Sequence, residues 1–220
     1  MPAPPQALLR SLRDAIARLE KAPPPGGGAV LPTGLAALDA LLGGGVVRGR
    51  VAELHGGPAS GKTTLALLAL ARATDLGLAA YVDGPGELYA PAVAALGVTL
   101  PRLLVVRPKT LAQALWSAEV LARAGTFAVV AADLTGLNGA VPPAASRRLA
   151  EAADAGRAAV LLLAPVPTGL TTSLRLRSSA AGPGRLRVEV ERGGAPGSNV
   201  LLDLADPTAH ALPPLALVPG

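Results

Sequence analysis

The sequence predicts an α/β fold in which a mostly parallel sheet is flanked by helices and continues into a C-terminal antiparallel β-hairpin. Continuous apolar strands alternate with helical segments through most of the chain, which is typical of a parallel sheet covered on both faces. A glycine-rich turn joins one such strand to a helix at residues 56–63. The last third of the chain instead alternates apolar and polar residues, the pattern of half-exposed antiparallel strands.

The predicted elements follow one another with short connections. Apolar runs bounded by turn residues predict strands, and apolar residues at spacings of three and four predict helices. The expected strands of the parallel part are 51–55, 78–83, 103–106, 127–132 and 158–163, and the expected helices are 33–42, 62–74, 91–96, 111–124 and 144–155. Segments 173–177 and 185–191 predict the hairpin, and 199–204 predicts one more strand.

Three parts of the chain differ in composition. Residues 1–28 predict an amphipathic helix, Gln6 to Lys21, followed by a Pro/Gly linker. Residues 29–204 form the predicted core domain, and residues 205–220 form a Pro-rich tail. A helix set apart by such a linker either docks on a neighbouring subunit or partner, which predicts self-association, or packs on its own domain.

Composition excludes several classes of protein. The 220 residues include no cysteine and only one Phe, one Trp and two Tyr, so the core consists of Ala, Leu and Val and holds no disulfide or thiolate metal site. His55 and His210 lack metal-ligand spacing.

No apolar run reaches the ~18 residues of a membrane helix and no signal peptide is expected, so we predict a cytoplasmic protein with no membrane partner. The net charge of +5, mostly arginine, fits either a nucleic-acid or acidic partner or a GC-rich genome.

The turn after the first core strand carries the chemistry. Its residues fit the pattern G-x-x-x-x-G-K-[ST], with one more threonine following: Gly56, Gly57, Pro58, Ala59, Ser60, Gly61, Lys62, Thr63 and Thr64. Between a strand and a helix, such a loop surrounds a β-phosphate with backbone N–H groups, and the helix dipole adds positive potential. Lys62 then reaches the β- and γ-phosphates, and the Thr63 hydroxyl binds Mg²⁺. We therefore predict ATP and Mg²⁺ as ligands; the alternative is a loop that no longer binds a nucleotide.

A Mg²⁺ site of this kind also needs an acid at the end of another strand, to hold the water shell of the ion. Asp133 ends the strand that begins at Phe127 and is the predicted residue. Its alternative role is to cap the turn that follows. Asp83, which ends the strand 78–83, is the second candidate.

The order and spacing of these motifs resemble the RecA-like recombinase core over residues 31–203. The segments that carry the resemblance are Leu31-Pro-Thr-Gly-Leu-Ala-Ala-Leu-Asp39, Gly49-Arg-Val-Ala-Glu53, the loop ending Gly61-Lys62-Thr63-Thr64, Tyr81-Val82-Asp83, Leu96-Gly97-Val98 and Ala158 to Leu163. The shortened core with altered catalytic positions is most similar to the ImuA-type branch. That resemblance implies an adaptor in damage-induced translesion DNA synthesis, part of the SOS response, with RecA or the translesion polymerase accessory subunit as partner.

Several positions depart from the family's pattern. The family's catalytic glutamate corresponds to Pro85, with Glu87 as the nearby substitute, so the resemblance implies weak or absent ATP hydrolysis. In an ungapped alignment the family's metal-binding acid falls at Ala132, one residue before Asp133. Arg192 matches one of two basic residues that reach the neighbouring subunit's nucleotide, and glycines stand where the second is expected.

The segments that correspond to the family's two DNA-binding loops, 134–145 and 165–173, contain no basic or aromatic residue. Because phosphate contacts and base stacking dominate affinity for single strands, we do not expect these loops to bind single-stranded DNA. The polar face of the hairpin carries four arginines: Arg175, Arg177, Arg185 and Arg187. They form either a patch for phosphates or an acidic partner, or a solvated face balanced by Glu189 and Glu191.

Two other functions stay open at this point. One is an active DNA-dependent ATPase of the RecA or RadA type in recombinational repair, and the other is a RecA-like ATPase in signalling or clock-type regulation. DNA-stimulated ATP hydrolysis discriminates the first of these from an adaptor.

Overall fold

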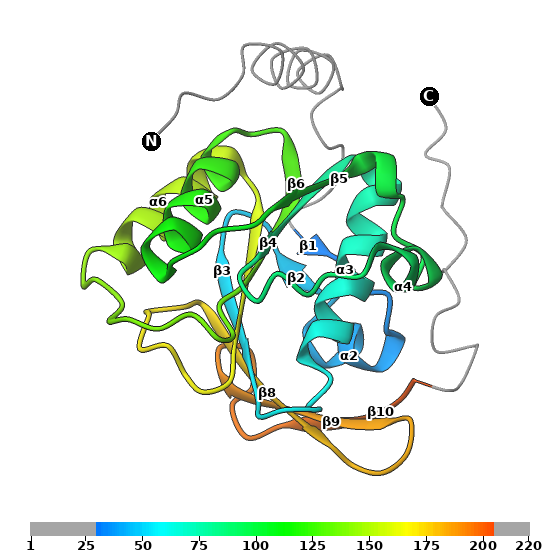
Figure 1. Cartoon of the computed structure of the whole chain (residues 1–220). Helices are drawn as coiled ribbons and strands as arrows, with labels where there is room; N and C mark the ends of the chain where they lie inside the picture. The colour runs from blue at the N-terminus through cyan, green and yellow to red at the C-terminus, as the bar shows by residue number, and fades with distance from the viewer. Residues whose placement is uncertain (1–29, 205–220) are drawn as a thin grey trace, which may run out of the picture.

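The computed structural model describes residues 30–204, which build one eight-stranded sheet with helices on both sides (Figure 1). In their order across the sheet, the strands are β10 (Asn199–Asp203), β9 (Arg185–Arg192), β8 (Leu174–Ala180), β3 (Val51–His55), β7 (Ala159–Ala164), β6 (Phe127–Asp133), β4 (Leu78–Asp83) and β5 (Leu103–Val106). The six strands from β8 to β5 are parallel, and β9 and β10 are antiparallel to their neighbours.

Helices cover both faces of the parallel part. On one face α3 (Lys62–Leu76) packs against β6, β4 and β7, and on the other face α5 (Leu111–Arg123) packs beside α6 (Ala145–Gly156), as Figure 1 shows. The shorter elements are β1 (Val30–Leu31), α2 (Ala36–Leu41), β2 (Val46–Val47), α4 (Ala90–Ala95) and the 3₁₀ helix η1 (Leu100–Arg102). Strands β1 and β2 pair with each other in a separate antiparallel ladder.

Side-chain alternation along the strands divides the core into two layers. Ala131 of β6 and Tyr81 of β4 belong to the apolar cluster under α3, whereas Ala132 and Val82 belong to the cluster under α5 and α6. Every residue of β3, β4, β6 and β7 is buried, because a parallel strand covered on both faces has no solvent side.

The predicted fold class is confirmed, and the predicted bounds of the strands 78–83 and 103–106 are those of β4 and β5. The first hairpin strand is longer than predicted: β8 runs to Ala180 and is also hydrogen-bonded to β3, so the hairpin continues the central sheet. Strands β1 and β2 were not predicted, because two residues carry no periodicity.

The predicted helix at 6–21 and the Pro-rich tail lie outside the described residues. Within residues 30–204 no helix has the length and apolar content to cross a membrane.

Candidate nucleotide-binding site

The glycine-rich loop lies between the carboxyl end of β3 and the first residue of α3. The Gly56 N–H donates to the Ala164 carbonyl of β7 (3.2 Å), and the Ser60 N–H donates to the Gly57 carbonyl (3.3 Å). Gly61 precedes α3 with a φ of 77°, in the left-handed region that favours glycine. The first backbone N–H groups of a helix have no intrahelical acceptor, so the loop ends on a set of donors that an anion can use.

Strands β8 and β9 pack directly against this loop. A Cβ atom at Gly61 would lie 2.2 Å from Leu186 Cδ1 on β9, and a Cβ atom at Gly56 would lie 2.3 Å from the Ser178 carbonyl oxygen on β8. A Cβ atom at Gly57 would meet nothing within 4 Å. The hairpin strands therefore help determine the shape of the loop, and only glycine fits at its first and last positions.

Two buried polar groups of the loop are poorly satisfied. The Lys62 side chain is buried, and the hydrogen bond from its ammonium to the Gly57 carbonyl is 3.5 Å long, the limit of such a bond. The Ser60 hydroxyl is buried without a hydrogen-bond partner among the described residues. The ammonium of a buried lysine, with one long contact within residues 30–204, is stabilised when an anion joins it. The loop therefore fits a phosphate group, which Lys62 and the backbone amides would hold.

Asp133 faces the same side of the sheet as α3. Two residues before it, Ala131 lies in the cluster under α3, whereas Ala132 lies under α5 and α6. Because β3 and β6 are parallel in one sheet, Asp133 and the loop also share the carboxyl edge. An acid at position 133, and not at 132, therefore points to the side of the helix that begins with Lys62.

Two groups hold the Asp133 carboxylate. Its Oδ1 accepts from the Thr135 N–H (2.9 Å), and its Oδ2 accepts from the Tyr81 hydroxyl (3.2 Å). Burial, and then the Asp133 carboxylate, raise the pKa of Tyr81 above its ordinary value. No sequence pattern predicts Tyr81 as a site residue, because its contact with Asp133 depends on the register of two strands.

Asp83, the second candidate, has several partners of its own. Its Oδ1 accepts from the Glu87 N–H, and its Oδ2 accepts from the Leu88 N–H and from Arg107 Nε, each at 3.1 Å. Asp83 thus caps the turn that contains Pro85 and neutralises Arg107. The backbone of Glu87 is fixed by this cap, and its side chain is exposed.

The four hairpin arginines all contact acidic or amide oxygens. Their partners are Glu53 for Arg175 (2.5 Å), Glu189 and Glu191 for Arg177, Asp203 for Arg185 (3.2 Å) and Asn199 for Arg187 (3.0 Å). These contacts argue against a free basic patch. Glu189 and Glu191 balance Arg177 alone, and Arg175 is largely buried beside Glu53 instead of lying on a solvated face. The exposed side chain of Arg192, at the end of β9, makes no hydrogen bond or ion pair within residues 30–204.

The loop between β7 and β8, residues 165–173, is fixed at two points. The fully buried Glu53 accepts from the Thr168 N–H through Oε1 (2.6 Å), and Arg175 Nη2 donates to the Leu170 carbonyl (3.1 Å). The ion pair of Glu53 and Arg175 therefore connects this loop to β3 and β8. Arg175, predicted as one of four arginines on the polar face of the hairpin, thus also holds the loop through its contacts with Glu53 and Leu170.

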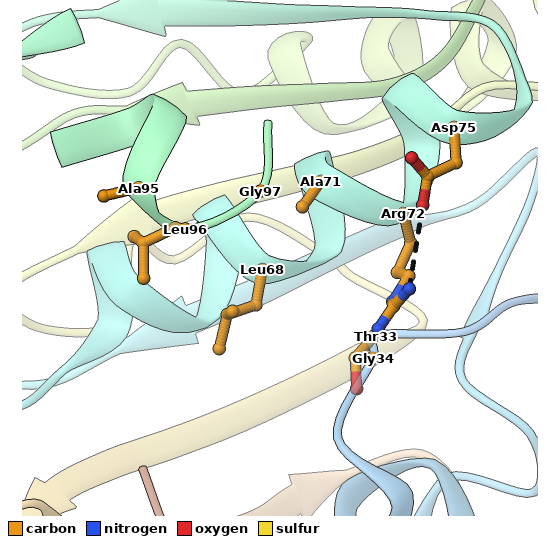
Figure 2. A pocket seen from close by; sticks show the side chains of 9 residues that line it. All are labelled: Thr33, Gly34, Leu68, Ala71, Arg72, Asp75, Ala95, Leu96 and Gly97. Carbon is orange, nitrogen blue, oxygen red and sulfur yellow. Dashed lines mark ion pairs between the residues drawn. The ribbon is translucent and has the colours of Figure 1, made fainter. Parts of the chain in front are cut away.

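A separate pocket of about 420 Å³ lies beside the later half of α3 (Figure 2). Its lining residues come from α3, from the turn after β1 and from the end of α4: Leu68, Ala71, Arg72, Asp75, Thr33, Gly34, Ala95, Leu96 and Gly97. Leu68 lies about 9 Å along the helix from Lys62, at ~1.5 Å per residue. The pocket is therefore distinct from the glycine-rich loop.

Three comparisons place the chain among known proteins. Residues 13–149 match the family model of the RecA N-terminal domain. Protein RecA of Symbiobacterium thermophilum is 47% identical over 106 residues, which cover 47% of this chain and 30% of the relative. Protein RecA of Salinispora tropica is 48% identical over 107 residues, which cover 48% of this chain and 31% of the relative. The match thus spans less than a third of the length of these curated relatives.

Among solved structures, the crystal structure of the RadB recombinase superposes with a TM-score of 0.66. The superposition covers 78% of this chain and 94% of the RadB chain, at 22% sequence identity. The likeness shows a shared fold.

Proposed function

Because the chain belongs to the RecA N-terminal domain family, we propose that it binds ATP and Mg²⁺ at residues 56–64 and hydrolyses ATP slowly or not at all. The proposal rests on two observations: the loop has the groups needed to bind a phosphate, whereas the position of the family's catalytic glutamate holds a proline. The loop presents a buried, poorly satisfied Lys62 to a phosphate, whereas the position expected for the water-orienting glutamate is Pro85, in a turn closed by Asp83. Lys62, Thr63 and Asp133 would hold the nucleotide and its ion, and Mg²⁺ supplies charge neutralisation at the phosphates.

The proposed role is that of an adaptor that acts through protein partners. The segments 134–145 and 165–173 contain no basic residue, the second is fixed by Glu53 and Arg175, and the hairpin arginines have polar partners. A DNA strand would therefore find few free cations on these elements. The ImuA-type resemblance leads us to propose damage-induced translesion synthesis as the setting, with RecA or the translesion polymerase accessory subunit as partner.

A second candidate is a DNA-dependent ATPase in recombinational repair. It is favoured by the 47% identity to Protein RecA in a segment of 106 residues. It requires another group, such as Glu87, to orient the attacking water, and a DNA-binding surface outside the two loops.

The discriminating experiment measures ATP binding and ATP turnover, with and without single-stranded DNA, for the wild type, Lys62→Ala and the control Lys109→Ala. Lys109 is an exposed lysine outside the site. We expect Lys62→Ala to weaken ATP binding about tenfold or more, by loss of a charge-assisted contact. Lys109→Ala should bind ATP as the wild type does. ATP turnover by the wild type should be no faster than turnover by Lys62→Ala, with or without DNA. Unchanged ATP affinity in Lys62→Ala would refute the site. DNA-stimulated turnover that Lys62→Ala abolishes would establish the second candidate.

The adaptor role is tested by partner capture. We expect the purified full chain to retain RecA or the polymerase accessory subunit, and deletion of residues 1–28 to reduce this binding or self-association. Retention of neither protein would contradict the adaptor proposal while leaving the ATP site intact.

A further inference from the structure

Of the two tyrosines within residues 30–204, only Tyr81 is buried. Its hydroxyl points to Asp133, the carboxylate proposed to bind the water shell of Mg²⁺. Tyr81 lies on β4 with 2% of its surface exposed, and the neighbouring Asp133 of β6 is 4% exposed. The hydroxyl donates to Asp133 Oδ2 across the two strands at 3.2 Å. The ring packs in the cluster under α3, the helix that begins at Lys62.

We propose that Tyr81 is a positioning residue for the Mg²⁺ that accompanies ATP: its hydroxyl holds the Asp133 carboxylate in the orientation in which it faces the loop and binds the water shell of the ion. This inference rests on the proposed function, because it assumes that the loop binds a nucleotide with Mg²⁺. It assigns Tyr81 no contact with the ion.

The position of the acid explains why such a support is needed. A buried carboxylate requires hydrogen bonds to both oxygens, and Asp133 obtains one from the Thr135 N–H and one from Tyr81. The Thr135 bond holds Oδ1 toward the turn after β6, so without the hydroxyl Oδ2 has no hydrogen-bond partner within residues 30–204. One donor on each oxygen leaves further lone pairs for the water shell of an ion.

The neighbouring acid is kept out of this arrangement. Asp83 stands opposite Asp133 in the strand register, and two ionised carboxylates at this spacing repel each other. Arg107 and the amides of Glu87 and Leu88 bind Asp83 and compensate its charge. Asp133 accepts two hydrogen bonds where Asp83 accepts three, and it bears no ion pair to a basic side chain within residues 30–204.

The test separates the metal-dependent part of nucleotide binding from the rest. ATP affinity is measured in EDTA and over a Mg²⁺ titration, for the wild type, Tyr81→Phe, Asp133→Asn and the control Tyr89→Phe, with thermal unfolding of each variant. Tyr89 is the other tyrosine of the chain, is 68% exposed and serves as the matched removal of a hydroxyl.

We expect Tyr81→Phe to raise the Mg²⁺ concentration needed for half-maximal strengthening of ATP binding about tenfold, the size of one hydrogen bond to a charged group. Its affinity in EDTA should equal that of the wild type, Asp133→Asn should lose the Mg²⁺ effect, and Tyr89→Phe should behave as wild type. A merely structural tyrosine would weaken binding equally with and without Mg²⁺, and that result overturns the proposal.

An unchanged Mg²⁺ titration in Tyr81→Phe or in Asp133→Asn also overturns it. Failure of the proposed function is recognised separately, because ATP binding would then be insensitive to Lys62→Ala. If Lys62→Ala abolishes binding while Tyr81→Phe leaves the Mg²⁺ response unchanged, the ATP site stands and the role of Tyr81 falls.

Discussion

The buried ion pair of Glu53 and Arg175 offers the sharpest test of the energetics of this fold. Glu53 is fully buried on β3, and the Arg175 side chain on β8 is 19% exposed. Glu53→Gln removes the negative charge and retains an oxygen for the Thr168 N–H, so it leaves the Arg175 guanidinium largely buried beside a neutral amide.

The magnitude follows from the burial of the partner that is left behind. Breaking a fully buried pair by changing one partner destabilises by about 3–5 kcal/mol, and the partial exposure of Arg175 puts the expected loss for Glu53→Gln at about 3 kcal/mol. For a domain of this size that corresponds to a fall in Tm of about 6–12 °C. Arg175→Met, which strands the carboxylate, should lose a similar amount.

The assay is a double-mutant cycle in urea, with thermal unfolding as a second measure. The double variant Glu53→Gln/Arg175→Met contains no unpaired charge, so its loss should be smaller than the sum of the single losses by about 2 kcal/mol or more. Glu151→Gln is the control, because its pair with Arg147 is exposed at 52% and 84% and should contribute less than about 0.5 kcal/mol. Additive single and double losses would refute this account of the pair.

The same cycle reports on the loop 165–173. Arg175→Met removes the contact to the Leu170 carbonyl, so amide exchange in this loop should accelerate in that variant, whereas Glu53→Gln keeps an acceptor for the Thr168 N–H and should change it less. Exchange as slow as in the wild type would show that the loop is held by other contacts.

Three further predictions concern the loop, the pH dependence and the hairpin. Gly61→Ala should lower the free energy of unfolding by about 2 kcal/mol or more, because its φ is 77° and its Cβ would meet Leu186 at 2.2 Å, whereas Gly57→Ala, with nothing within 4 Å, should unfold as the wild type does. The pKa of Tyr81 is raised in the folded state, so its contribution to stability is complete below the unfolded pKa of about 10 and is lost as pH rises above it. In urea unfolding between about pH 9 and 11, the free energy of unfolding should therefore fall more steeply for the wild type than for Tyr81→Phe. Equal slopes would contradict the buried, hydrogen-bonded state of the Tyr81 hydroxyl. Arg192→Ala should change stability by less than about 0.5 kcal/mol in urea unfolding, because this exposed side chain has no partner within the described residues, and a larger loss would reveal a contact that this account lacks.

Much of the fold was predictable because its signals are local. The apolar run 78–83 between Gly77 and Gly84 predicted β4 with its bounds, and the motif ending Gly61-Lys62-Thr63 predicted where α3 begins. Each of these depends on residues that are neighbours in the chain. The pairing of β8 with β3 was not predictable in the same way, because it joins segments more than a hundred residues apart.

In the candidate site too, the local features were predictable from the sequence and the long-range contacts were not. The sequence by itself determined the loop at 56–63, the acid that ends β6 and the proline at position 85, since each is a residue type within or directly after a recognisable local segment. Only the tertiary structure decided that Asp133 faces α3, that Tyr81 holds it and that Leu186 packs against the loop.

The physical reason is the two-residue period of a strand. A shift of one position reverses the face to which a side chain points, so the difference between Ala132 and Asp133 is decided by packing and register. The hairpin arginines follow the same rule. Their positions and charges are in the sequence, but the acids that pair with Arg175, Arg177 and Arg185 lie on other strands, and only the folded sheet brings these together.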